Sequence, residues 1–155
     1  MEPYNYTSDV MNHKKLVKDY LDGVALHLAQ RGIKHDDSKF EPEERETYER
    51  VIPVLRTMEY GTQEYEETKQ QLGSALDHHY QHNDHHIEYF ENGIRQMDLF
   101  QLMEWLCDQM AAARRSPDGD FWKSLEIARK HYGISDQLYN ILENTIITLG
   151  GKGAR

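Results

Sequence analysis

Apolar residues recur every three or four positions through most of this chain, and no stretch shows the apolar-polar alternation of a half-buried strand. The first apolar stripe comprises Val10, Leu16, Val17, Tyr20, Leu21, Val24 and Leu28. The most apolar stripe comprises Leu99, Leu102, Met103, Leu106, Met110 and Ala113. Because this spacing places apolar side chains along one face of an α-helix, the chain is predicted to be all-α.

Glycine, proline and capping residues divide the chain into six or seven predicted helices. Ser8 is a candidate N-cap of the first helix, Gly32 its stop, and Pro53 is expected to bend or break the second. The predicted helices cover residues 9–31, 43–60, 62–81, 84–90, 99–113, 121–132 and 135–149. No linker composition separates them, so we expect one compact helical bundle over residues 1–149 and a disordered tail over 150–155.

Size, charge and cysteine content narrow the class of protein. A chain of 155 residues has the usual size of one domain. Its net charge of −9 argues against long nucleic acid or an anionic membrane as partner. A single cysteine, Cys107, excludes an intramolecular disulfide and favours a reducing compartment. With no membrane-length apolar run and no signal-peptide pattern at the start, we expect a cytoplasmic protein.

Histidine is the unusual component. Five of the nine histidines stand between positions 78 and 86: His78, His79, His82, His85 and His86. Several of them would converge on a continuing helix, and a turn at Asn83 would also bring them together. Imidazole and carboxylate together suit one or two Mn, Fe, Co, Ni or Zn ions. The alternative is a solvated polar helix face.

Four further residues are candidate metal ligands. His13 lies on the apolar stripe of the first helix, where the alternative is a core histidine bonded to a backbone carbonyl. His35 and Asp36 offer adjacent nitrogen and oxygen ligands, although Asp36 could simply be a turn residue. Asp108 is a lone acid on the most apolar helix, and buried carboxylates are usually paired or metal-bound. Its alternative is an exposed helix position.

The order His13, His35-Asp36, Asp108 resembles the HD-domain superfamily of helical metal-dependent phosphohydrolases. The segment HDDSK is similar to the HD-x-G-K form of the branch that carries two metals, with Ser38 at the usual glycine. That branch adds histidines between the HD pair and the final Asp, where His79, His85 and His86 lie. More narrowly, residues 10–115 look like small phage and bacterial proteins known only as a domain of unknown function.

This resemblance implies a phosphohydrolase or phosphodiesterase that acts on a small nucleotide-like phosphoester. Asp36 would bridge two cations that activate a water. Asp36 and the neighbouring cation Lys39 are therefore the candidate catalytic residues. Lys39, Arg114 and Arg115 would bind the phosphate. The alternative for the two arginines is a favourable interaction with a helix C-terminus.

Two other functions remain open from the sequence. Some HD relatives with two metals bind di-iron and oxidise a substrate with O₂, so a di-iron oxygenase is one alternative. The other is a non-catalytic, metal-stabilised phage adaptor or anti-defence protein that binds a host protein. The sequence specifies neither the substrate nor the oligomeric state, and a homo-oligomer is one of the alternatives.

Overall fold

The computed structural model describes residues 4–115 and 119–150. Within these ranges the chain forms seven α-helices, four short 3-10 helices and no strand, which confirms the all-α prediction. The backbone divides into two compact units, Met1–His35 and Asp36–Arg155. The single domain predicted over residues 1–149 stays a prediction. Residues 151–155 of the predicted tail lie outside the described residues.

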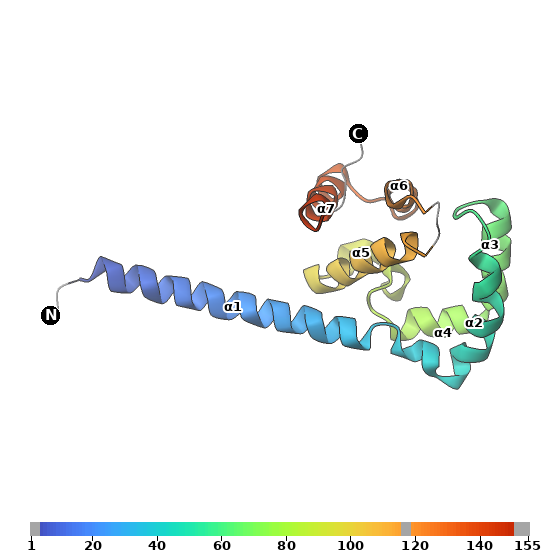
Figure 1. The fold of residues 1–155 in the computed structure, drawn as a ribbon, viewed down its shortest axis with the longest axis horizontal. Helices are drawn as coiled ribbons and strands as arrows, with labels where there is room; N and C mark the ends of the chain where they lie inside the picture. Colours follow the sequence, from blue (N-terminus) through green and yellow to red (C-terminus); the bar gives the residue numbers. More distant parts are fainter. Residues whose placement is uncertain (1–3, 116–118, 151–155) are drawn as a thin grey trace. The chain divides into compact units, whose positions relative to one another are not determined.

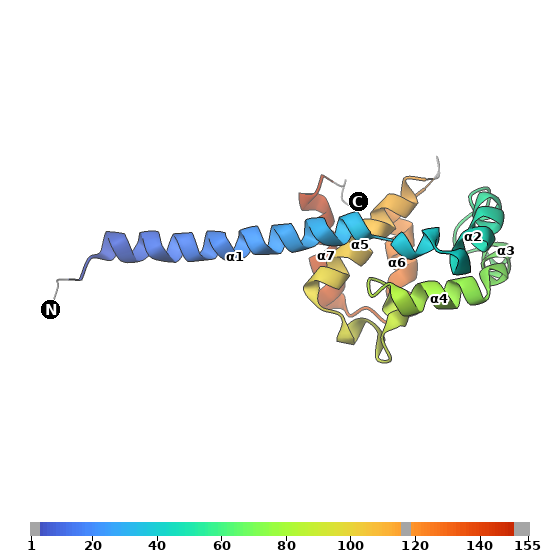
Figure 2. The same cartoon turned by 90° about the horizontal axis from the view of Figure 1, so that it is seen from below.

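The first unit is the single helix α1, Tyr6–Lys34, seen unbroken in Figure 2. Asn5 is its N-cap, because its side chain accepts a hydrogen bond of 3.0 Å from the Ser8 backbone N–H. The helix therefore begins before the predicted cap. It also continues through Gly32 to the C-cap His35. A glycine inside a helix costs only about 1 kcal/mol relative to alanine, so Gly32 does not have to end it.

The second unit opens with five short elements. They are the 3-10 helix η1 (Asp37–Phe40), α2 (Pro42–Leu55), α3 (Gln63–Lys69), the 3-10 helix η2 (Gln70–Leu72) and α4 (Ser74–His82). The Thr62 side chain caps α3, but the predicted helix 62–81 is divided at Gly73. Gly73 has φ +48° and ψ −127°, a conformation that other residues rarely adopt. The helix predicted over 43–60 ends at Leu55, two residues after Pro53.

Helix α2 packs against α3 and α4 in this half of the unit (Figure 1). A small apolar cluster forms there from Val51, Leu55 and Leu72, with Tyr65 and Leu76 packed against it. This cluster holds α2 beside α4. As a result, residues from α2 can reach the histidines at the end of α4.

The second half contains the most apolar helix. Its elements are the 3-10 helices η3 (Ile87–Tyr89) and η4 (Gly93–Gln96), then α5 (Leu99–Ala113), α6 (Phe121–Tyr132) and α7 (Asp136–Thr148). The helix predicted over 84–90 is only the single turn of η3. Gly133, with φ +63°, ends α6 in the left-handed conformation.

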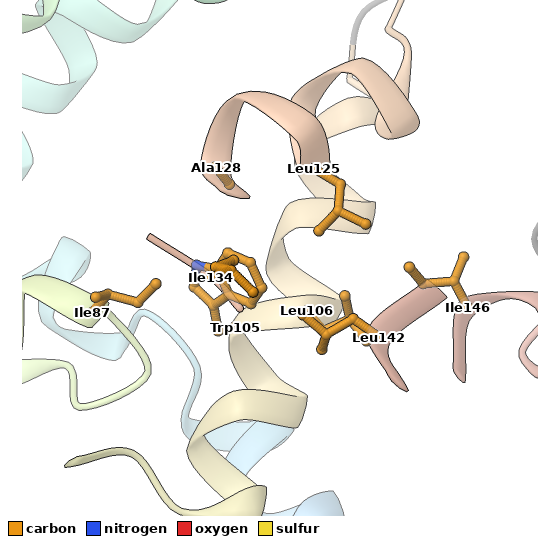
Figure 3. Packing of buried hydrophobic residues seen from close by; sticks show 8 residues of the cluster. All are labelled: Ile87, Trp105, Leu106, Leu125, Ala128, Ile134, Leu142 and Ile146. Atoms are coloured by element: carbon orange, nitrogen blue, oxygen red, sulfur yellow. The ribbon is translucent and has the colours of Figure 1, made fainter. Parts of the chain in front are cut away.

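The main core lies between α5, α6 and α7. It comprises Ile87, Trp105, Leu106, Leu125, Ala128, Ile134, Leu142 and Ile146 (Figure 3). Because Trp105 and Leu106 are buried in it, the rotation of α5 about its axis is fixed. A neighbouring face of α5 then presents Gln101, Glu104 and Asp108, which follow the helical spacing of three and four.

In the part of the chain that the structure describes, no helix has both the length and the apolar composition needed to cross a bilayer.

Candidate metal centre

Four side chains of the second unit meet at one point. Asp36, His79, His85 and His86 each offer a ligand atom, and these atoms all lie within 4.8 Å of one another. Oδ1 of Asp36 is 3.3 Å from Nε2 of His79 and 3.5 Å from Nε2 of His85. The Nε2 atoms of His79 and His86 are 2.8 Å apart. We call these four residues the candidate centre.

Asp36 reaches the centre through an uncommon backbone conformation. Its φ is +62°, and among the described residues it is the only one other than glycine with a positive φ. Aspartate tolerates this left-handed region better than most side chains because it is short and polar. The Asp36 carbonyl accepts a hydrogen bond of 2.9 Å from the Lys39 N–H, which closes the first turn of η1.

Glu44 of α2 orients His79. The Glu44 carboxylate is fully buried, and its Oε2 lies 2.9 Å from Nδ1 of His79. A carboxylate can only accept, so the Nδ1–H of His79 donates to it. The lone pair then lies on Nε2, which is 3.3 Å from Oδ1 of Asp36. Metal-binding histidines commonly have a carboxylate behind them in this way.

Glu104 of α5 faces His85 in the same manner. His85 is buried, and its Nδ1 lies 3.2 Å from Oε1 of Glu104. Its Nε2 again lies toward Asp36. Two histidines from different segments thus turn Nδ1 to a carboxylate and Nε2 to the same oxygen of Asp36.

His86 is the fourth residue of the centre, and Asp108 lies beside it. Burial, together with the neighbouring His85 and His79, lowers the pKa of His86 to about 3, although Asp108 acts in the opposite direction. The ring is therefore neutral near pH 7, the form in which imidazole binds metals. A carboxylate oxygen of Asp108 lies within 4.8 Å of a ring nitrogen of His85. The acid predicted from the most apolar helix does lie beside the centre.

Buried polar contacts join the Asp36 segment to the end of α4. The Asn83 amide donates to Oγ of Ser38 at 2.7 Å and to the His79 carbonyl at 2.8 Å. Both Ser38 and Asn83 are buried. Ser38 stands where the resembled motif has glycine, and its hydroxyl serves as one end of this link.

The other two clustered histidines lie outside the group of four. His78 bonds through Nδ1 to Oε1 of Glu44 at 2.8 Å. His82 bonds to the His78 carbonyl at 2.8 Å and stacks on the His78 ring, with ring centroids 3.9 Å apart. The structure therefore brings together the three clustered histidines predicted as ligands, His79, His85 and His86.

Two predicted ligands, His13 and His35, lie far apart on the continuous helix α1. His35 is the C-cap of α1 and precedes Asp36 in the chain. His13 is exposed on the same helix, about 33 Å before His35 at ~1.5 Å of rise per residue. Because α1 is continuous between them, His13 and His35 of one chain cannot bind the same ion in this conformation.

The predicted cations differ in position. Lys39 Nζ lies 2.5 Å from Oδ2 of Asp36 and 5.4 Å from the centre of the Tyr48 ring. Arg114 is the C-cap of α5, and Arg115 follows it. Arg115 lies near enough to Tyr65 to act on the pKa of that tyrosine, which burial raises to about 12. Lys39 is thus the predicted cation that contacts the centre directly.

The donor set fits a divalent transition metal. Metal–nitrogen bonds of about 2.1 Å place neighbouring ligand atoms roughly 3.0–3.4 Å apart in octahedral or tetrahedral geometry. The separations between 2.8 and 3.5 Å are close to that range. Imidazole nitrogen with carboxylate oxygen suits Mn, Fe, Co, Ni and Zn.

Sequence reasoning missed the two carboxylates behind the histidines. Glu104 carried a signal, because it lies four residues before Asp108 on the same face of the predicted helix. Glu44 carried none, since it is one of several glutamates in the segment EPEERE and only its burial distinguishes it.

Comparison with known proteins identifies a family without assigning a reaction. Neither the curated proteins nor the solved structures gave a match. The model of a family of unknown function, DUF5662, matches residues 2–148. Because that match spans nearly the whole sequence, the chain belongs to the DUF5662 family of unknown function.

Proposed function

We propose that this protein is a metal-dependent phosphohydrolase or phosphodiesterase that acts on a nucleotide-like phosphoester. One observation carries the proposal: His79 and His85 both turn Nε2 toward Oδ1 of Asp36, while Glu44 and Glu104 lie against their Nδ1 atoms. This arrangement of ligands and orienting carboxylates is typical of metal centres. The segment HDDSK and the histidines after it resemble the two-metal branch of the HD-domain superfamily, and this resemblance adds the reaction class.

The chain's own residues would hold and orient the cofactor. Asp36, His79, His85 and His86 would bind one divalent ion, and Asp108 would contribute to a second ion beside His85. A bound cation would polarise the phosphoryl group and lower the pKa of a water ligand toward about 7. Glu44 and Glu104 would keep the two imidazoles in the tautomer that presents Nε2.

Lys39 would have a separate role, in charge neutralisation. Its ammonium pairs with Oδ2 of Asp36, the oxygen that does not face His79 and His85, and the side chain is 30% exposed. From that position it would meet negative charge that develops on phosphoryl oxygens. Arg114 and Arg115, at the end of α5, stay predicted phosphate contacts.

The test begins with the metal content of protein purified without a histidine tag. The protein is then loaded in turn with Mn²⁺, Co²⁺, Fe²⁺, Ni²⁺ and Zn²⁺. Each form is offered nucleoside mono- and triphosphates, cyclic mono- and dinucleotides, and an aryl phosphodiester. We expect turnover with at least one metal. Lys39→Met should keep the metal and lower turnover about tenfold or more, because an ammonium does not ligate.

Two outcomes would contradict the proposal. Loaded protein that cleaves no phosphoester but consumes O₂ with a small alcohol or phosphonate would instead be a di-iron oxygenase. Loaded protein that does neither, yet depends on the metal for stability, would support the metal-stabilised adaptor.

A further inference from the structure

Gln101, on the first turn of α5, uses both ends of its side-chain amide. Its Oε1 accepts a hydrogen bond of 2.8 Å from the Asp98 backbone N–H, while Oδ1 of Asp98 accepts from the Gln101 N–H at 2.9 Å. This reciprocal pair is a capping box at the start of the helix. At the other end, Nε2 of Gln101 donates to Oδ2 of Asp84 at 2.9 Å.

The chemistry of the partners fixes the amide orientation. A backbone N–H can only donate, so the atom that faces Asp98 must be the amide oxygen. The amide nitrogen then necessarily faces Asp84, whose carboxylate accepts. Glutamine satisfies both partners at once, whereas glutamate would satisfy only the capping box.

Asp84 belongs to the segment that supplies two residues of the candidate centre. It stands between the buried Asn83 and the buried His85, and His86 follows. Helix α5 contacts this segment at two successive points, with Gln101 on Asp84 and Glu104 on His85. Asp108, one turn farther along α5, is near His85. Gln101, Glu104 and Asp108 thus line one face of α5, and Gln101 is the first of them along the helix.

We propose that Gln101 is a positioning residue that fixes the register of segment 83–86 on α5, a role that rests on the proposed metal centre. Without the bond to Asp84, the segment would lose this hydrogen bond to the first turn of α5. The imidazole of His85 would then be held less firmly between Glu104 and Asp36. Residues that orient metal ligands in this way typically change metal affinity 10- to 100-fold when replaced.

Gln101→Glu separates the two roles of the side chain. The glutamate still accepts from the Asp98 N–H and keeps the capping box, but it faces Asp84 with a second carboxylate. The double variant Asp84→Asn/Gln101→Glu exchanges donor and acceptor and restores the hydrogen bond. Gln96→Glu is the matched control, because Oε1 of Gln96 also accepts a backbone N–H, from Asn92 at 2.7 Å.

Two measurements are made on the full chain. Amide hydrogen exchange of residues 83–86 in metal-free protein reports the register itself. Co²⁺ titration followed by visible absorption reports affinity and ligand geometry. We expect faster exchange, about tenfold weaker Co²⁺ binding and an altered spectrum in Gln101→Glu, recovery in the double variant and no change in Gln96→Glu.

The results separate the two proposals. Unchanged exchange and Co²⁺ binding in Gln101→Glu, or no recovery in the double variant, would overturn the role of Gln101. If the wild-type chain takes up no Co²⁺ or other divalent ion, the metal centre and proposed function fail. The register role then stands or falls on the exchange measurement alone.

Discussion

The side chains of Glu44 and His79 form a buried pair, with Oε2 of Glu44 2.9 Å from Nδ1 of His79. The glutamate is 0% exposed and the histidine 2% exposed. The other oxygen of Glu44 bonds to His78, so one buried carboxylate serves two adjacent histidines of α4. A carboxylate is costly to bury, and these two bonds offset that cost. The pair links α2 to the residues that face Asp36.

Replacing Glu44 tests this link. In Glu44→Gln the amide offers an acceptor to only one of the two histidines, and the other faces a donor. We expect metal affinity to fall 10- to 100-fold. The free energy of unfolding of the metal-free protein should fall by about 1–3 kcal/mol, the cost of a buried unmatched donor. Calorimetric titration and urea unfolding measure the two effects. Glu46→Gln, exposed on the same helix, should change neither.

Asp36→Asn removes the charge of the ligand that both His79 and His85 face. Asparagine is chosen because it tolerates the left-handed conformation of residue 36, in which alanine would be strained. We expect metal content to fall about tenfold or more with the helical circular dichroism unchanged. The neighbouring Asp37→Asn, exposed in η1, should retain its metal. Equal stoichiometry in the two variants would remove Asp36 from the centre.

Asp108→Asn tests whether the acid on α5 takes part. Because Asp108 lies within 4.8 Å of a nitrogen of His85, we expect weaker binding of one equivalent of metal, detected by elemental analysis. Asp77→Asn, exposed on α4, is the matched control. Full metal content in Asp108→Asn would make Asp108 a neighbour of the centre rather than a ligand.

Leu106→Ala probes the core that fixes the rotation of α5. Leu106 is 0% exposed, whereas Leu99 on the same helix is 79% exposed. We expect Leu106→Ala to lower the free energy of unfolding by about 2–5 kcal/mol. Leu99→Ala should change it by about 0.5 kcal/mol or less. Urea unfolding of both variants measures the difference, and equal losses would contradict the core assignment.

The ionisation of Tyr132 should make the free energy of unfolding depend on pH in alkaline solution. Its hydroxyl donates to Oε1 of Glu88 at 2.7 Å. Burial, and to a smaller extent the negative charge of Glu88, raises the pKa of Tyr132 above its ordinary value. The unfolded tyrosine ionises near about pH 10. The contribution to stability is therefore complete below pH 10 and is lost as the pH rises above it. Tyr132→Phe should show a shallower fall between pH 10 and 11 in urea unfolding, whereas Tyr89→Phe should follow the wild type.

Local patterns were enough to predict the fold class and part of the candidate centre. Helical spacing identified α5, and the density of histidine after residue 78 identified the segment that supplies His79, His85 and His86. Helix ends were less predictable, since Gly32 is tolerated inside α1 whereas Gly73 divides the expected polar helix. The difference lies in the backbone angles that tertiary packing imposes, and glycine alone does not reveal them.

Long-range contacts explain what sequence reasoning missed. Glu44 differs from its neighbouring glutamates only in being enclosed when α2 packs on α4. His13 and His35 illustrate the opposite case, because both fit the order of a known pattern but stand at distant positions of one continuous helix. Order along the chain does not measure separation in space.

The candidate centre and the carboxylates beside it come from segments that begin at Asp36 and end near Asp108. Bringing such distant segments together requires long loops to close, and that entropy must be lost before the donors can converge. A cation that binds only after convergence would add little to the rate at which the chain folds. It would instead slow the opening of the folded molecule, because its bonds would be absent from the folding transition state. The ion would thus govern how long the structure persists rather than how soon it forms.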